Sequence, residues 1–227
     1  QGWANESLQG MGRFVGSAEA QEWAESANRY PPELLTHDCQ GRRIDYVRFH
    51  PAYHSLMAAG FGRAVHSVAW AADHTGGHVA HCALEYLLYQ VEAGVCCPLT
   101  MTYASIPALR QQPDLAAEWE SKIISAAYDP TYRPVSEKSA ASIGMAMTEK
   151  QGGSDLRQTA TRAYGIGGAG EFLLTGHKWF CSAPMSDAFF TLAQSEKGLS
   201  CFFVPRWRPD GSRNPFYLQR LTNQLGN

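Results

Sequence analysis

The chain has 227 residues, of which 44% are hydrophobic and 11% aromatic, enough apolar side chains for one large or two modest globular domains. Its 19 basic and 21 acidic residues give a formal net charge of −2, so the composition does not favour binding to a nucleic-acid backbone. No apolar run has the length of a membrane span, and the first residues lack the pattern of a signal peptide.

The first half of the chain carries the patterns of helices. Ser17 is expected to cap a helix that runs to about Asn28 and stops before two prolines. Residues 33–48 are polar and turn-rich, which indicates a hairpin or a connecting loop. Apolar side chains at helical spacing predict further helices over residues 53–72, 79–94, 96–109 and 113–128. Gly60 and Gly62 weaken the first of these, unless they allow close packing against another helix.

The second half of the chain carries the pattern of β-strands instead. From residue 142 onwards, short runs rich in β-branched and aromatic side chains alternate with turns at intervals of about ten residues, which is typical of a sandwich or barrel. Strands are expected over residues 143–148, 159–164, 171–175, 177–182, 188–193, 199–204 and 216–221. Residues 165–170 are expected to form a glycine-rich hairpin loop.

Residues 145–182 contain the polar groups that could bind a ligand. Gly152 and Gly153 allow positive φ and could point successive amides at one anion. Thr148 and Ser182 would each present a hydroxyl at the end of a strand. Together these groups could hold a flat, polar-edged ring with a phosphate tail. Taken alone, the run from Gly152 to Asp155 favours a tight hairpin turn followed by an ordinary half-buried strand.

The combination of motifs resembles a known signature. Thr148-Glu149, Gly153-Ser154-Asp155 and Gly176-x-Lys178 leading to Phe180-x-Ser182 resemble the flavin-binding signature of the acyl-CoA dehydrogenase family. Longer runs are similar to its AidB-type branch, the alkylation-response proteins. They cover residues 31–35, 48–51, 90–94, 145–155, 176–180, 199–206 and 219–221.

The resemblance implies an α+β fold and an FAD cofactor. An N-terminal helical domain, residues 1–137, would precede a small antiparallel β-barrel middle domain, residues 138–227. Because the chain does not begin with Met and the resemblance ends inside the β domain, we expect a window on a longer protein. The family's C-terminal helical bundle would be absent from it.

The resemblance also implies roles for individual residues. Met145, Met147 and Thr148 would line the pyrimidine edge of the flavin, and Gly153 and Ser154 would contact the pyrophosphate. Three further positions would lie beside the isoalloxazine, with the last near its N5 atom: Phe180, Cys181 and Ser182. Phe180 stands where the family has Trp. The family's catalytic base, a carboxylate of the C-terminal bundle, maps to no residue here.

Other polar groups have simpler interpretations. Glu149 is expected to satisfy local amides. His74, His78 and His81 have the spacing of a metal site on one helix face, but two glycines between the first two favour a loop followed by a helix start. The cysteines form no Cys-x-x-Cys pair and several lie in apolar runs, which favours a reduced, cytoplasmic setting.

Three functional hypotheses remain open at this point. The first is an FAD-dependent oxidoreductase acting on CH–CH groups, with weak activity on acyl-CoA or another small substrate. The second is a DNA-protection protein with a structural FAD, which binds double-stranded DNA through a basic C-terminal region. The third is an adaptor without a cofactor. The resemblance further implies a homo-oligomer, with a homotetramer expected.

Overall fold

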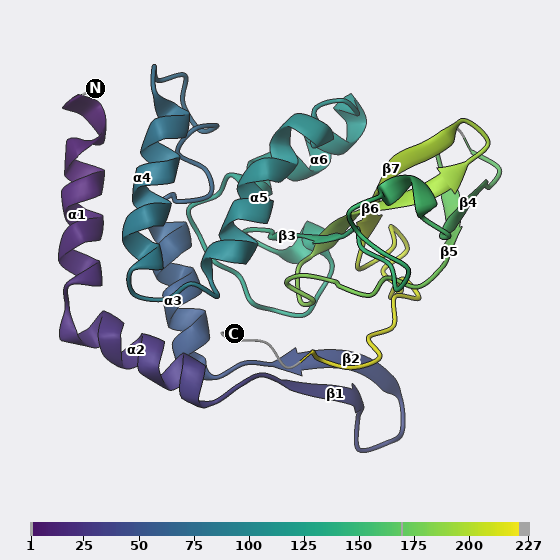
Figure 1. Ribbon diagram of the computed structural model, residues 1–227, viewed down its shortest axis with the longest axis horizontal. Coiled ribbons are helices and arrows are strands. Elements are labelled where there is room, and N and C mark those ends of the chain that lie inside the picture. The colour runs from purple at the N-terminus through teal and green to yellow at the C-terminus, as the bar shows by residue number, and fades with distance from the viewer. Residues whose placement is uncertain (1, 169, 223–227) are drawn as a thin grey trace.

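The computed structural model describes residues 2–168 and 170–222. Helices gather at one end and a sheet at the other, with a two-stranded hairpin running along one side of both (Figure 1). After a short 3₁₀ turn the elements are α1 (Asn5–Val15), α2 (Ala18–Arg29), β1 (Glu33–His37), β2 (Arg43–Arg48), α3 (Pro51–Gly62), α4 (Gly77–Tyr89), α5 (Cys96–Leu109) and α6 (Pro113–Ile123). The strands of the sheet are β3 (Ile143–Ala146), β4 (Arg162–Gly165), β5 (Phe172–Thr175), β6 (Ala188–Ser195) and β7 (Gly198–Pro205).

Local signals explain where several helices begin. The Ser17 hydroxyl accepts a hydrogen bond from the Ala20 amide at 3.2 Å, which confirms the predicted cap of α2. The β1–β2 hairpin occupies the segment for which a hairpin or loop was expected. α1 was not predicted, because its sequence contains two glycines and it buries only Met11 and Phe14.

Three helices are shorter than their patterns predict. α3 ends at Gly62 rather than residue 72, and Ala64 then takes a positive φ of 54° in a series of turns. α4 starts after Gly76, whose φ is 85°, and ends at Tyr89 rather than residue 94. α6 ends at Ile123 instead of continuing to residue 128. In each case apolar residues beyond the end of the helix lie in turns or irregular backbone. Their spacing is the same as in a helix, so the sequence pattern could not show where the helix ends.

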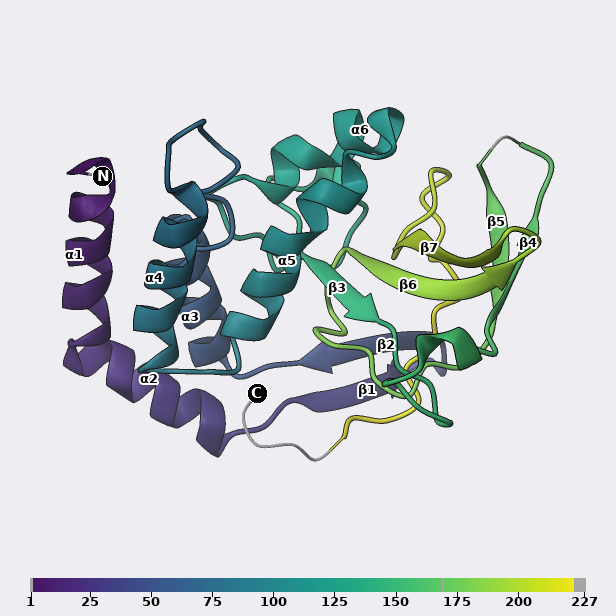
Figure 2. The same cartoon turned by 45° about the horizontal axis from the view of Figure 1, so that its top comes forward.

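The five-stranded sheet is built around β6. β7 pairs antiparallel with β6 along its whole length, and β3 and β4 both pair with it in parallel on the other side. β5 extends the sheet as the antiparallel partner of β4. The β4–β5 hairpin projects from the end of the molecule far from α1 (Figure 2).

The prediction of an antiparallel barrel is therefore corrected. The sheet is mixed, and within residues 2–168 and 170–222 it does not close on itself. Residues 177–182 form no strand, since their pairing is limited to a single bridge between Met145 and Ser182. Residues 216–221 are also irregular. In the second run Phe216 stacks on Phe189 of β6, whereas Trp179 and Phe180 in the first run are about 40% exposed.

Two cores hold the molecule together. One lies among the helices, and the other joins α5 and α6 to the sheet through Ile106, Leu109, Ile143 and Phe190. The Ile143 amide also donates to the Thr102 hydroxyl at 3.1 Å, which fixes β3 against α5. None of the described helices has the length and apolar character needed to cross a membrane.

Candidate functional site

A long groove follows the sheet, and several of the predicted site residues line it. Its volume is about 2790 Å³, above the roughly 300–1,000 Å³ typical of a small-molecule pocket. Residues 176–184, the two long strands β6 and β7, and residues 214–222 contribute nearly half of the residues that line it. A space of this size could hold an extended ligand along one part of its length.

Two segments that are distant in sequence form one side of the groove. The Trp179 amide donates to the Thr148 carbonyl at 2.8 Å, and the Ser182 amide donates to the Met145 carbonyl at 3.0 Å. We call residues 145–148 and 179–182 together the site wall. Gly144 permits this approach, because a Cβ there would lie 2.7 Å from the Ser182 carbonyl oxygen.

Four of the predicted site residues line the groove: Thr148, Phe180, Cys181 and Ser182. Met145 and Met147 belong to the site wall through their backbone, but their side chains pack against the core that joins the helices to the sheet. Neither residue lines the groove. Their predicted place at the pyrimidine edge stays a prediction.

The glycine turn has a different geometry from the one expected. Glu149 and Gly152 exchange backbone hydrogen bonds of 3.1 and 3.2 Å, and Gly152 has a φ of 151°. Gly153 does not have a positive φ, and it is required for packing, since a Cβ there would lie 2.6 Å from the Thr148 Oγ1 atom. The Gly153 and Ser154 amides donate to no acceptor within the described part of the chain, so they remain available to an anion.

The groove-lining side chains of the site wall offer an aromatic face and two hydroxyls. The Phe180 side chain is 40% exposed. The hydroxyls of Thr148 and Ser182, both half-buried, form no hydrogen bond within residues 2–168 and 170–222. Burial raises the pKa of the Cys181 thiol to about 12, which favours the protonated thiol at neutral pH.

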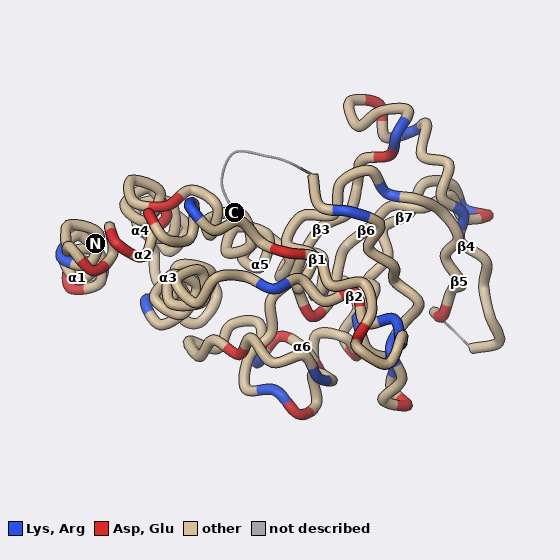
Figure 3. Tube along the Cα trace, turned by 90° about the horizontal axis from the view of Figure 1, so that it is seen from below, with Lys and Arg blue, Asp and Glu red and all other residues tan. Residues whose placement is uncertain are grey.

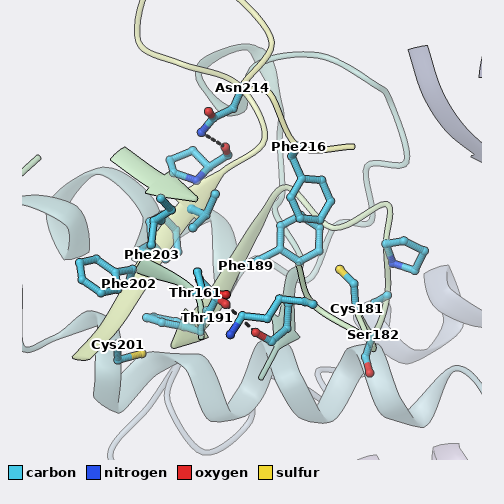
Figure 4. A pocket seen from close by; sticks show the side chains of 18 of the residues that line it. Thr161, Cys181, Ser182, Phe189, Thr191, Cys201, Phe202, Phe203, Asn214 and Phe216 are labelled. Atoms are coloured by element: carbon cyan, nitrogen blue, oxygen red, sulfur yellow. Dashed lines mark hydrogen bonds between the residues drawn. The ribbon is translucent and has the colours of Figure 1, made fainter. Parts of the chain in front are cut away.

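Aromatic side chains fill the groove opposite these groups. The Phe189 ring from β6 stacks on Phe216 with the centroids 4.6 Å apart and the planes at 16°. Figure 4 shows this stack between Cys181 and Ser182 on one side and Phe202 with its β7 neighbours on the other. The groove therefore contains an aromatic stack beside Cys181 and Ser182.

Two residues were not predicted to belong to the site: Phe216, which lines the groove, and Arg206, which is buried near Phe216 and does not line it. Phe216 was assigned to a strand, and Arg206 was quoted only as the end of a family motif. The Arg206 side chain is buried, donates from Nε to the Ser186 carbonyl at 3.0 Å, and lies 5.8 Å from the Phe216 ring centroid. Burial lowers the pKa of its guanidinium. Neither position carries a local sequence signal, because both depend on contacts between distant segments.

Glu149 has the structural role that was expected. Its carboxylate is buried and accepts hydrogen bonds from the backbone of Ala160 and Thr161 and from the side chains of Gln151, Thr161 and Lys178. Burial alone would raise its pKa, but the hydrogen bonds, led by that from Lys178, outweigh burial and lower the pKa to about 2. The carboxylate is thus ionised, and both of its oxygens already accept hydrogen bonds from the protein. This arrangement does not suit a catalytic base.

The histidines do not form a metal site in this structure. His74 lies in a loop and stacks on Trp3 at 4.4 Å, and His78 contacts the Tyr103 hydroxyl at 2.6 Å. His81 is buried and bonds the Val65 carbonyl at 2.6 Å. No group of three His, Cys, Asp or Glu side chains within the described residues could hold a metal ion.

The family model for the adaptive response protein AidB N-terminal domain matches residues 1–130, and the model for the acyl-CoA dehydrogenase middle domain matches residues 144–226. AidB of Escherichia coli (strain K12) is 49% identical over 228 aligned residues, which cover 100% of this chain and 42% of that protein.

Solved structures share the fold of this chain. Caenorhabditis elegans ACDH-11 in complex with C11-CoA has a TM-score of 0.84 at 25% identity, covering 98% of this chain and 39% of that one. A glutaryl-CoA dehydrogenase from Mycobacterium smegmatis in complex with FADH2 has a TM-score of 0.61 at 16% identity, covering 91% and 46%. The chain thus spans less than half the length of the relatives it matches.

Proposed function

Because the chain belongs to the AidB-type branch of the acyl-CoA dehydrogenase family, we propose that it contributes one side of an FAD site in a flavin-dependent oxidoreductase. The observation that carries this proposal is the site wall. It places Thr148, Phe180, Cys181 and Ser182 along one groove although the 30 residues 149–178 separate its two segments in the sequence.

The groups on the site wall suit a flavin. A half-exposed Phe180 ring offers a flat apolar surface, and the Thr148 and Ser182 hydroxyls can donate to or accept from the polar edge of an isoalloxazine. The unbonded Gly153 and Ser154 amides suit a phosphate, although neither residue lines the groove. A bound flavin would supply hydride acceptance at N5, and the protein would hold and orient its ring.

The fold of the relatives supports the same proposal. The mycobacterial glutaryl-CoA dehydrogenase, which shares this fold, was solved with FADH2. The C. elegans relative was solved with C11-CoA, so we propose a fatty acyl-CoA as the substrate class, with oxidation of a CH–CH group as the reaction. We assign the catalytic base to no described residue. The buried carboxylate next to the site wall, that of Glu149, already accepts hydrogen bonds from Lys178 and other donors.

The test starts with the full-length protein and FAD. Bound flavin gives a visible absorption spectrum, and titration of flavin-free protein gives a dissociation constant. Ser182→Ala should weaken binding, because it removes one of the two unbonded hydroxyls of the site wall. Protein that is colourless and cannot be reconstituted with FAD would refute the proposal. Turnover of a chain-length series of acyl-CoA thioesters with an artificial electron acceptor then tests the substrate class.

A second candidate is DNA protection with a structural FAD. The matching family model is described as an adaptive response protein, which favours this candidate. In the part of the chain drawn in Figure 3, basic and acidic residues are interspersed along the trace, so duplex binding would have to involve other regions of the protein. Duplex affinity that does not change between low and moderate salt would contradict a contact with phosphates.

Assembly and compartment belong to the same proposal. We expect a homotetramer in a reduced cytoplasmic setting, which the six free cysteines favour. Sedimentation or light scattering of the full-length protein measures the oligomer directly, and a monomer at micromolar concentration would contradict it.

A further inference from the structure

We infer that Lys178 and Glu149 act as a pair of positioning residues that set the spacing of the site wall, and so control how tightly and in what environment the flavin is held. The inference rests on the proposed FAD site. Glu149 does not line the groove, and Lys178 lines it but directs its ammonium group to protein acceptors. The role of the pair would be to orient the groups that touch the cofactor.

The Lys178 ammonium group joins three segments. It donates to the Glu149 carboxylate at 2.8 Å, to the Leu192 carbonyl of β6 at 2.7 Å and to the Met147 carbonyl at 3.5 Å. Its side chain is only 13% exposed. An ammonium group has three donors, so all its bonding capacity is used in linking residues 147–149, residue 178 and the centre of the sheet.

The Glu149 carboxylate joins further backbone to the same point. It accepts from the Ala160 amide at 2.7 Å and from the Thr161 amide at 3.1 Å, which fixes the segment leading into β4. It also accepts from the Gln151 side chain at 2.6 Å, across the tight turn. A carboxylate with this many donors inside the protein has little freedom to move.

The positions of the pair connect it to the groove. Glu149 follows Thr148 directly in the chain, and Lys178 directly precedes Trp179, whose amide bonds the Thr148 carbonyl. The ion pair therefore closes the end of the site wall at which its two segments meet. Loss of the pair would let residues 145–148 and 179–182 separate, and an error of about 1 Å in such a support is enough to impair a site.

A purely stabilising role predicts a different response from a positioning role. Removing only one partner of a buried ion pair leaves an uncompensated charge, whereas neutralising both partners relieves that penalty. Stability should therefore recover when both charges are removed. The spacing that the three donors of Lys178 impose cannot recover, because Met donates no hydrogen bonds.

The experiment compares Lys178→Met with the double variant Glu149→Gln/Lys178→Met in the full-length protein. For each, the melting temperature of the flavin-free form, the dissociation constant for FAD and the visible spectrum of bound flavin are measured. Arg157→Met is the control, because Arg157 forms an ion pair with Asp155 near the same turn but is 87% exposed.

We expect the single variant to lose melting temperature and the double variant to regain it. Both should bind FAD about tenfold more weakly or worse, with a shifted flavin spectrum, as is typical when outer supports of a site are removed. The control should match wild type in all three measurements. A dissociation constant that returns to the wild-type value in the double variant, or never changes, overturns the positioning role. Wild-type protein that binds no FAD overturns the proposed function itself, and the inference with it.

Discussion

Gly144 offers a sharp test of how the site wall is packed. It lies in β3, and a Cβ at this position would lie 2.7 Å from the Ser182 carbonyl oxygen and 2.7 Å from two carbons of the Phe189 ring. Neither neighbour can move easily. The Ser182 backbone is bonded to Met145, and the Phe189 ring is buried and stacked on Phe216. Gly144→Ala should therefore force the site wall away from β3.

Gly165 provides a matched control in the same sheet. It lies in β4, has no positive φ, and a Cβ there would have the Phe172 ring as its nearest neighbour at 4.0 Å. Replacing Gly by Ala in a strand favours the folded state by about 0.5–1 kcal/mol, because the unfolded chain loses freedom. Overpacking at Gly144 costs about 1–3 kcal/mol or more and reverses that sign.

The two variants should differ in unfolding free energy by about 1–3 kcal/mol, or roughly 2–12 °C in melting temperature for a protein of this size. Urea denaturation of both variants and wild type measures the difference. Gly144→Ala should also weaken FAD binding, because Ser182 moves with the wall, whereas Gly165→Ala should not. If the Gly144 variant is as stable as the Gly165 variant, the close approach of residues 144 and 182 is wrong.

Two further predictions concern stability. Ser17→Ala should cost about 1 kcal/mol through loss of the α2 cap, measured by denaturation, whereas Ser55→Ala should be neutral because its hydroxyl bonds only the Pro51 carbonyl within its own helix. Burial lowers the pKa of His66 to about 4, against about 6.5 in the unfolded chain, so its stabilising effect is complete above pH 6.5 and is lost as pH falls towards 4. Unfolding free energy should fall by about 2 kcal/mol from pH 7 to pH 5 through this group, and a His66→Leu variant whose stability falls just as steeply would contradict the assignment.

The helices show what local patterns can and cannot predict. The start of α2 was predictable because Ser17 caps it through neighbours three residues away. The end of α3 was not. Val65 and Val68 continue its apolar spacing, yet both pack from turns after Ala64 takes a positive φ. A helical period identifies residues that face a core, but it does not require the backbone to remain helical between them.

The sheet shows the same limit in another form. The strands β6 and β7 were predicted within about two residues of each end, which is as close as boundaries can be placed from a pattern. Their hairpin is local. The parallel pairing of β3 and β4 with β6 depends instead on contacts across more than 30 positions, such as Met145 with Phe190, and alternation of side chains does not reveal strand direction.

The candidate site depends both on local sequence motifs and on contacts between distant segments. Residue types at Thr148, Phe180 and Ser182 pointed to a flavin through their motif, and the structure brings them to one groove. The motif also contains Glu149, which does not line the groove, and Lys178, which lines it but donates to Glu149 and to backbone carbonyls. A motif thus includes residues with polar groups that are free to meet a ligand and residues with polar groups that hold the protein together. Only the structure separates the two groups, because it shows which polar atoms already have partners within the protein.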